Sequence, residues 1–153
     1  MLGKEELKQR NTDFWTAFRT RMRKVPSSSG RTLDWIKYPL GMKDFYLRLE
    51  SDGKASRVCL DIQPKDDGIR SIFWEQMIEL KVVLESETGP AQWKEKYGEI
   101  RGRTISRIYW ENTELNFYLD EDLSKIAQYL EEKLVAFDRF YMEYKDLLLA
   151  LAE

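Results

Sequence analysis

The stretch from Ile69 to Glu85 constrains the fold of this chain more than any other. Its apolar residues recur at three- and four-residue steps and cover more than half of the circumference of a helix. They are Ile69, Ile72, Phe73, Trp74, Met77, Ile78, Leu80, Val82, Val83 and Leu84. A helix this apolar is expected to lie between a sheet and a second covering element. Asp66 and Asp67 predict its start, and Gly89-Pro90 predicts its end.

Short strands are predicted on both sides of this helix. Residues 45–50 and 57–63 alternate apolar and polar side chains around an Asp-Gly turn, which predicts an antiparallel hairpin. A brief strand over residues 35–38 is expected to precede them and to end at Pro39. After the helix, residues 92–97 and 103–111 predict a second hairpin that turns around Gly98 to Gly102.

Two further helices are predicted, one towards each end of the chain. The first covers residues 4–24 and is followed by the connector Ser27 to Gly30, which is expected to be flexible. The second covers residues 120–151 and would be roughly 48 Å long at 1.5 Å per residue, which exceeds the width of a domain of this size. Either it breaks near Asp138 or part of it overhangs, and an overhanging apolar face would favour a homodimer through this helix.

The predicted order of elements is α-β-β-β-α-β-β-α. It predicts an α+β fold, with a mostly antiparallel five-stranded sheet, packed helices and a long C-terminal helix. The sequence contains no internal repeat and no clear linker, so residues 1–153 are expected to form a single domain. A chain of 153 residues buries about 70% of its unfolded surface, which is enough for one core.

Composition excludes several classes of chemistry. The chain contains no histidine, so no Ser-His-Asp triad, imidazole base or histidine-bound zinc can be assembled. Its single cysteine, Cys59, forbids an internal disulfide and predicts a small buried residue. What remains is chemistry by carboxylates, lysine and Mg²⁺, or no catalysis at all, and no cofactor is predicted.

The sequence predicts a cytoplasmic protein that does not enter a membrane. It has no run of 18 or more apolar residues, and the N-terminal segment MLGKEELKQR is charged where a signal peptide would be apolar.

Charge is distributed unevenly along the chain. Residues 1–57 carry 13 basic against 7 acidic side chains, and residues 58–153 carry 12 against 20. A basic set with Trp35 and Tyr38 nearby would suit a nucleic-acid backbone. The set comprises Arg19, Arg21, Arg23, Lys24, Arg31, Arg101, Arg103 and Arg107. The net charge of −2 favours the alternative, in which these residues form a solvated charged surface.

A second set of residues fits a Mg²⁺-dependent nuclease. Restriction-type nucleases share an α-β-β-β-α-β core and hold the metal with an acidic residue and an acidic-x-Lys or Gln-x-Lys pair on neighbouring strands. The corresponding residues here are Asp44, Glu50, Asp61, Gln63 and Lys65. Pro64 weakens this hypothesis because it ends the strand between Gln63 and Lys65, and a solvated strand end is the alternative interpretation.

Aromatic and apolar motifs throughout the chain carry a resemblance to a known family. These are Phe14-Trp15-x-x-Phe18, Leu33-Asp34-Trp35, Ile69-x-x-Ile72-Phe73, Glu79-Leu80-Lys81, Trp93 and Ser106-Arg107-Ile108. From about Leu7 to Tyr144 the chain resembles a bacterial family of uncharacterised domains, domain of unknown function family 4268. Its members look like stand-alone proteins or lie C-terminal to restriction-type nuclease domains. The resemblance implies a link to nucleic acids but supplies no catalytic residues.

The sequence therefore favours a non-catalytic binding module over an enzyme. A second copy of the chain, bound through the C-terminal helix, is the first partner to consider, and nucleic acid is the second. The Mg²⁺-dependent nuclease-like enzyme remains the alternative.

Overall fold

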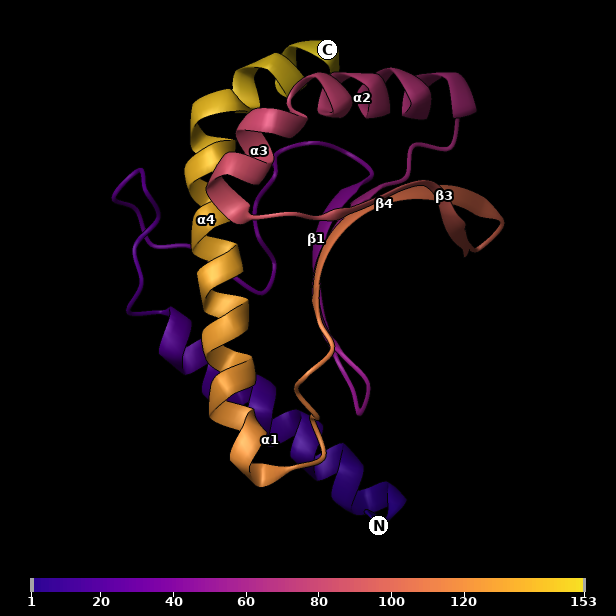
Figure 1. The fold of residues 1–153 in the computed structure, drawn as a ribbon. Helices are drawn as coiled ribbons and strands as arrows, with labels where there is room; N and C mark the ends of the chain where they lie inside the picture. Colours follow the sequence, from indigo (N-terminus) through magenta and orange to yellow (C-terminus); the bar gives the residue numbers. More distant parts are fainter. Residues whose placement is uncertain (1, 153) are drawn as a thin grey trace.

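The fold contains four helices and four strands in the described residues, 2–152 of a computed structural model (Figure 1). In chain order they are α1 (Lys4–Met22), β1 (Phe45–Ser51), β2 (Ser56–Ile62), α2 (Asp67–Glu79), α3 (Lys81–Thr88), β3 (Gln92–Ile100), β4 (Arg103–Asn112) and α4 (Asp120–Ala152). The α+β class and the order of elements agree with the sequence prediction, but the sheet has four strands where five were expected.

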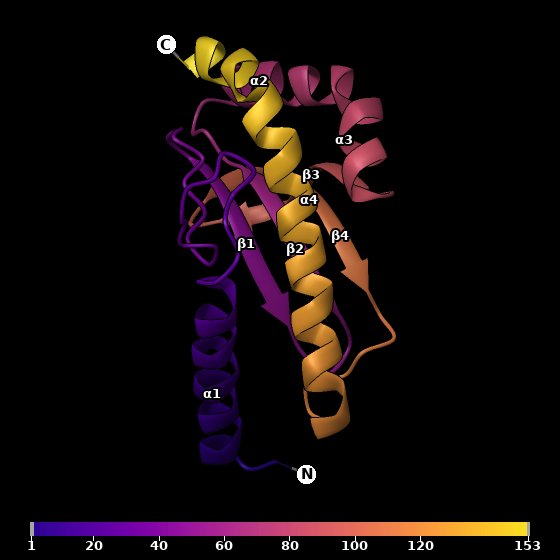
Figure 2. The same cartoon turned by 90° about the vertical axis from the view of Figure 1, so that its left-hand side faces the viewer.

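The four strands form one antiparallel sheet in the order β1-β2-β4-β3. Both predicted hairpins are present, and the pairing of β2 with β4 joins them at the centre of the sheet. The sheet is strongly curved, with α4 along its convex side (Figure 1). Seen from the helix side, α4 runs roughly along the strands in front of β2, and α1 lies towards the β1 side of the sheet (Figure 2). Helices α1 and α4 therefore do not cover the concave side of the sheet (Figure 1).

The predicted strand over residues 35–38 is a turn. The carboxylate of Asp34 accepts hydrogen bonds from the backbone N–H groups of Ile36 and Lys37, at 3.1 and 3.2 Å. This side-chain bond fixes a tight turn, which competes with an extended strand. Trp35 and Tyr38 are nevertheless buried, and the Trp35 indole donates to the carbonyl of Val25 at 2.9 Å. The apolar spacing that predicted a strand reflects two core residues on a loop.

The predicted central helix divides at Leu80 into α2 and α3. It begins and ends as expected, with the Asp66 side chain accepting from the N–H of Ile69 at 3.0 Å and with Gly89 following α3. Each of the two short helices buries only one side, and four apolar residues of the predicted helix are at least 44% exposed. These four are Ile69, Ile72, Ile78 and Val82. The prediction that the helix is covered on all sides is therefore wrong. The bend lets α3 pack against α4 instead.

Helix α4 is continuous over 33 residues and supplies much of the core. Its buried residues include Leu130, Leu134 and Phe137, which pack in one cluster with Leu60 and Ile108 of the sheet. Of the two predicted alternatives, the break near Asp138 is therefore excluded. Among the described residues, no helix has the length and apolar character needed to span a membrane.

Asp138 lies buried in the middle of α4 and holds the serine segment. Its carboxylate accepts from the Ser27 hydroxyl at 3.0 Å, the Ser28 N–H at 2.7 Å and the Tyr38 hydroxyl at 2.5 Å. Burial and then this hydrogen bond raise the pKa of Tyr38 far above its ordinary value, so the hydroxyl keeps the proton that it donates. The segment that the sequence predicted to be a flexible connector is fastened to α4.

Candidate functional site

The two faces of the sheet have different chemistry. Leu47, Leu60 and Ile108 are opposite one another in the strand register and pack in the core with α4. Because side chains alternate along a strand, Arg48, Asp61 and Arg107 point to the concave side. The concave side is therefore where polar side chains of three strands meet, and it is the candidate functional site.

Asp61 is the centre of a charged network on this concave side. It accepts two hydrogen bonds from Arg107, at 2.6 and 2.9 Å, and one from Arg48 at 2.6 Å. Asp61 is fully buried and the Arg107 side chain is 5% exposed, so this pair is removed from water. The two oxygens of Asp61 each accept one hydrogen bond from Arg107, which is the bidentate arrangement that suits a planar guanidinium.

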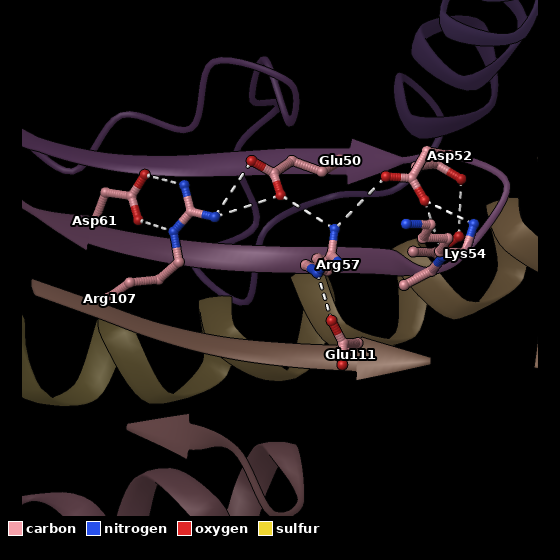
Figure 3. A network of polar contacts seen from close by, with 10 residues as sticks. Glu50, Asp52, Lys54, Arg57, Asp61, Arg107 and Glu111 are labelled. Carbon is pink, nitrogen blue, oxygen red and sulfur yellow. Dashed lines mark hydrogen bonds and ion pairs between the residues drawn. The ribbon is translucent and has the colours of Figure 1, made fainter. Parts of the chain in front are cut away.

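The network continues along the strands as a ladder of alternating charges (Figure 3). Arg107 also reaches Glu50 at 3.3 Å, and Arg57 contacts Glu50 at 3.5 Å and Glu111 at 2.5 Å. We call this set, Arg48, Asp61, Arg107, Glu50, Arg57 and Glu111, the ion-pair ladder. Its arginines and carboxylates are equal in number, so the ladder as a whole carries no net charge.

Tyrosine rings cover parts of the ladder. The guanidinium of Arg107 lies 4.3 Å from the centre of the Tyr97 ring, and that of Arg48 lies 4.5 Å from the Tyr46 ring. Tyr97 reaches this position because the register of β3 shifts between Lys94 and Gly98, which bends the hairpin over the concave side. Burial by itself would lower the pKa of Arg107, but the bonds and charge of Asp61 outweigh it and raise that pKa. Arg107 therefore stays charged.

Cys59 lies beside this network and contributes no reactive thiol. It is fully buried on β2, and burial raises the pKa of its thiol well above the ordinary value. The prediction that Cys59 is a buried sheet residue is confirmed.

A cleft of about 580 Å³ opens at one end of the ladder. We call it the hairpin cleft; its lining residues are Asp44, Tyr46, Arg48, Gln63, Ile100, Arg101 and Arg103. Arg101 and Gly102 form the two-residue turn between β3 and β4, with φ angles of 52° and 79°. Arg103 pairs with Asp44 at 3.1 Å, whereas Arg101 has no ion-pair partner among residues 2–152. Arg48 is paired with Asp61 and Arg103 with Asp44, so Arg101 supplies the positive charge of this cleft that has no counter-charge among residues 2–152.

The structure brings most of the nuclease-like set to the concave side but pairs it with arginines. Asp44 binds Arg103, while Glu50 and Asp61 both bind Arg107. Among the described residues, no three acidic, cysteine or histidine side chains are placed to hold a metal ion together. Guanidinium groups occupy the carboxylate oxygens that Mg²⁺ would need. The arrangement is that of a structural ion-pair network.

The last two members of that set lie where β2 has ended. The side-chain oxygen of Gln63 accepts from Arg48 at 2.8 Å. Lys65 follows the buried Pro64 and is exposed. The Gln-x-Lys spacing therefore does not place the two side chains together on one strand.

The predicted basic set is divided into two groups. Arg101 and Arg103 line the hairpin cleft, and Arg107 is in the ladder. The other five, Arg19, Arg21, Arg23, Lys24 and Arg31, lie at the end of α1 and in the segment after it. That region is on the α4 side of the sheet, whereas the hairpin turn is on the concave side (Figure 1). Arg21 pairs with Glu131 of α4 at 2.8 Å, so part of this second group supports helix packing.

Sequence reasoning missed Tyr46, Arg48 and Tyr97 as site residues. The alternation of Tyr46 and Arg48 with Phe45 and Leu47 was the available signal, since it places both polar side chains on the face opposite the core. Tyr97 carried no such signal, because its position depends on the irregular register of β3.

Comparison with known proteins identifies one family. A family model described as "Domain of unknown function (DUF4268)" matches residues 10–145. Neither a curated protein nor a solved structure matches the chain.

Proposed function

The chain belongs to the DUF4268 family of domains of unknown function, and on that premise we propose that it is a non-catalytic binding module whose ligand is single-stranded nucleic acid. The ligand would lie on the concave side of the sheet and enter the hairpin cleft. We further propose a cytoplasmic setting, in which the lone thiol of Cys59 would stay reduced.

The observation that supports this proposal is the contrast between the ladder and the cleft. In the ladder every carboxylate is held by an arginine, which leaves no free base for catalysis. In the hairpin cleft, by contrast, Arg101 is exposed and unpaired among the described residues, and Tyr46 is 43% exposed beside Arg48. Guanidinium groups would contact phosphates, and exposed tyrosine rings on a four-stranded sheet would stack with bases.

Fluorescence anisotropy of labelled single-stranded DNA and RNA, titrated with protein at about 50 and 200 mM salt, tests this function. With about three phosphate contacts, affinity should fall about 20-fold between the two salt concentrations. Arg101→Ala should weaken binding, and the number of phosphate contacts inferred from the salt dependence should fall by about one. The probe should stay intact on a gel when Mg²⁺ is present.

The matched control for this test is Arg31→Ala. Arg31 is exposed like Arg101 but lies in the segment after α1, so its loss should leave affinity unchanged. Loss of binding in Arg31→Ala with normal binding in Arg101→Ala would move the site to the other basic group. Flat anisotropy with every probe would refute a nucleic-acid function.

A specific observation also supports self-association through the end of α4, which we propose as a second function. Leu147 and Leu151 are 50% and 41% exposed there. The end of α4 contacts α2 (Figures 1 and 2), and α2 also carries apolar residues that are about half exposed, Ile69 and Ile72. Exposed apolar side chains on neighbouring helices are a feature of protein interfaces.

Sedimentation velocity over a range of protein concentrations tests this second function. The wild-type chain should show a mass that rises towards that of two chains, and Leu147→Glu should hold it at one chain. Val82→Glu is the control, because Val82 is 81% exposed but lies on α3 and not on α4 or α2. A wild-type chain that stays monomeric at every concentration would rule out this interface.

A further inference from the structure

The two edges of the sheet are protected to very different degrees. The β3 edge carries exposed charged residues at Lys94, Glu95 and Lys96 and has an irregular register, features that discourage pairing with another strand. The β1 edge, Phe45–Ser51, has no proline or lysine, and its register with β2 is unbroken over all seven residues. By the usual rules of edge protection, β1 is open to an added strand.

Two hydrogen bonds show which backbone groups of β1 face outward. The carbonyl of Asp44 accepts from Gln63, and the N–H of Asp52 donates to Ala55, so even-numbered residues are directed at β2. The odd-numbered residues Phe45, Leu47 and Leu49 must then direct their N–H and C=O groups away from β2. No further strand of the described residues pairs with them.

A groove of about 650 Å³ runs along this edge. Six consecutive residues of β1, from Phe45 to Glu50, line it, so side chains of both faces contribute and the groove follows the strand edge itself. The opposite wall contains Trp15 of α1 together with Ile36 and Lys37 of the turn. The turn and α1 therefore form one wall of the groove and β1 forms the other, so a single extended strand would lie between them.

We propose that this groove binds an extended segment of a partner protein, which adds to β1 as a fifth strand. Its backbone would pair with the outward groups of Phe45, Leu47 and Leu49. Side chains on the helix side would be apolar, because they would meet Trp15 and Ile36. Lys37 is exposed and has no ion-pair partner among residues 2–152, so the segment would carry acidic side chains. This proposal does not depend on the nucleic-acid function, although Tyr46 and Arg48 line both the groove and the hairpin cleft.

A labelled peptide of alternating sequence, Thr-Val-Glu-Val-Thr-Val-Glu-Val-Thr-Val, is the probe for this site. It should bind saturably in fluorescence anisotropy. Two N-methylated versions of the peptide, one methylated at the valines and one at the threonines and glutamates, distinguish strand addition from nonspecific binding. Each methylation pattern removes the N–H donors on one side of the strand only. One version should lose at least about tenfold in affinity and the other should bind normally. If the peptide pairs antiparallel to β1, methylation of the valines should weaken binding. If it pairs parallel to β1, methylation of the threonines and glutamates should weaken binding.

Charge reversal on the protein tests the wall of the groove. Lys37→Glu should weaken the glutamate peptide severalfold and strengthen a version in which lysine replaces glutamate. Lys65→Glu is the matched control, because Lys65 is also exposed but does not line the groove, and it should change neither affinity. Absence of saturable binding, equal losses with both methylated peptides, or equal effects of the two lysine variants would each overturn the proposal.

Discussion

Replacing Asp61 by alanine should lower the free energy of unfolding by about 3–5 kcal/mol. The change removes the partner that makes the two shortest hydrogen bonds to Arg107, at 2.6 and 2.9 Å. The guanidinium, which is 5% exposed, would keep only the longer contacts with Glu50 at 3.3 Å. The midpoint of thermal unfolding should fall by about 10 °C. Urea denaturation of the wild-type and variant chains measures the difference.

The same network supplies the controls for this result. Glu111→Ala removes an ion pair with Arg57 at the exposed end of the ladder and should cost less than about 1 kcal/mol. Adding Arg107→Met to Asp61→Ala should restore part of the loss, because the uncompensated charge is gone. A stable Asp61→Ala chain that no longer binds its ligand would show instead that Asp61 acts in binding.

Replacing Asp138 by alanine should cost about 3 kcal/mol or more. Asp138 is 1% exposed and accepts hydrogen bonds from Ser27, Ser28 and Tyr38. Its loss would leave these three donors in or near the core without an acceptor. Hydrogen exchange should also become faster in residues 27–29, since the loop would lose its attachment to α4. Urea denaturation and exchange measured on the same sample check both results.

Two variants on the same structure set the scale for Asp138→Ala. Asp146→Ala changes an exposed aspartate on the same helix and should lie within about 0.5 kcal/mol of wild type. Tyr38→Phe removes one of the three donors and should cost about 1 kcal/mol. An Asp138→Ala chain as stable as Asp146→Ala would mean that the carboxylate does not hold the loop.

The parts of the fold that could be predicted from sequence are those determined by neighbouring residues. The hairpin turn at Asp52 formed as expected because its carboxylate accepts from Lys54 and Ala55 within the turn itself. The capping of α2 by Asp66 is local in the same way. The strand expected at residues 35–38 failed for a local reason as well, since the Asp34 side chain favours a turn over an extended chain.

The candidate site was harder to predict because its contacts join distant parts of the chain. Asp61 and Arg107 are 46 positions apart, and they meet only through the register of β2 with β4. The sequence placed Asp61 in a catalytic set and Arg107 in a nucleic-acid set, with no indication that the two neutralise each other. Similarly, Ser27 and Asp138 are 111 positions apart, so the serine segment was predicted to be free.

Helix α4 makes the folding of this domain a cooperative event. It is linked to α1 through Arg10 and Asp120, and to the end of α3 through Lys133, whose ammonium donates to the carbonyl of Thr88 at 2.6 Å. Asp138 adds the serine segment, and the apolar side of α4 packs in one core with the sheet. Residues from both ends of the chain contact this one helix, so no part of the domain would keep its hydrophobic core if α4 unfolded. Amide hydrogens in the middle of α4 should therefore exchange only when the whole domain unfolds.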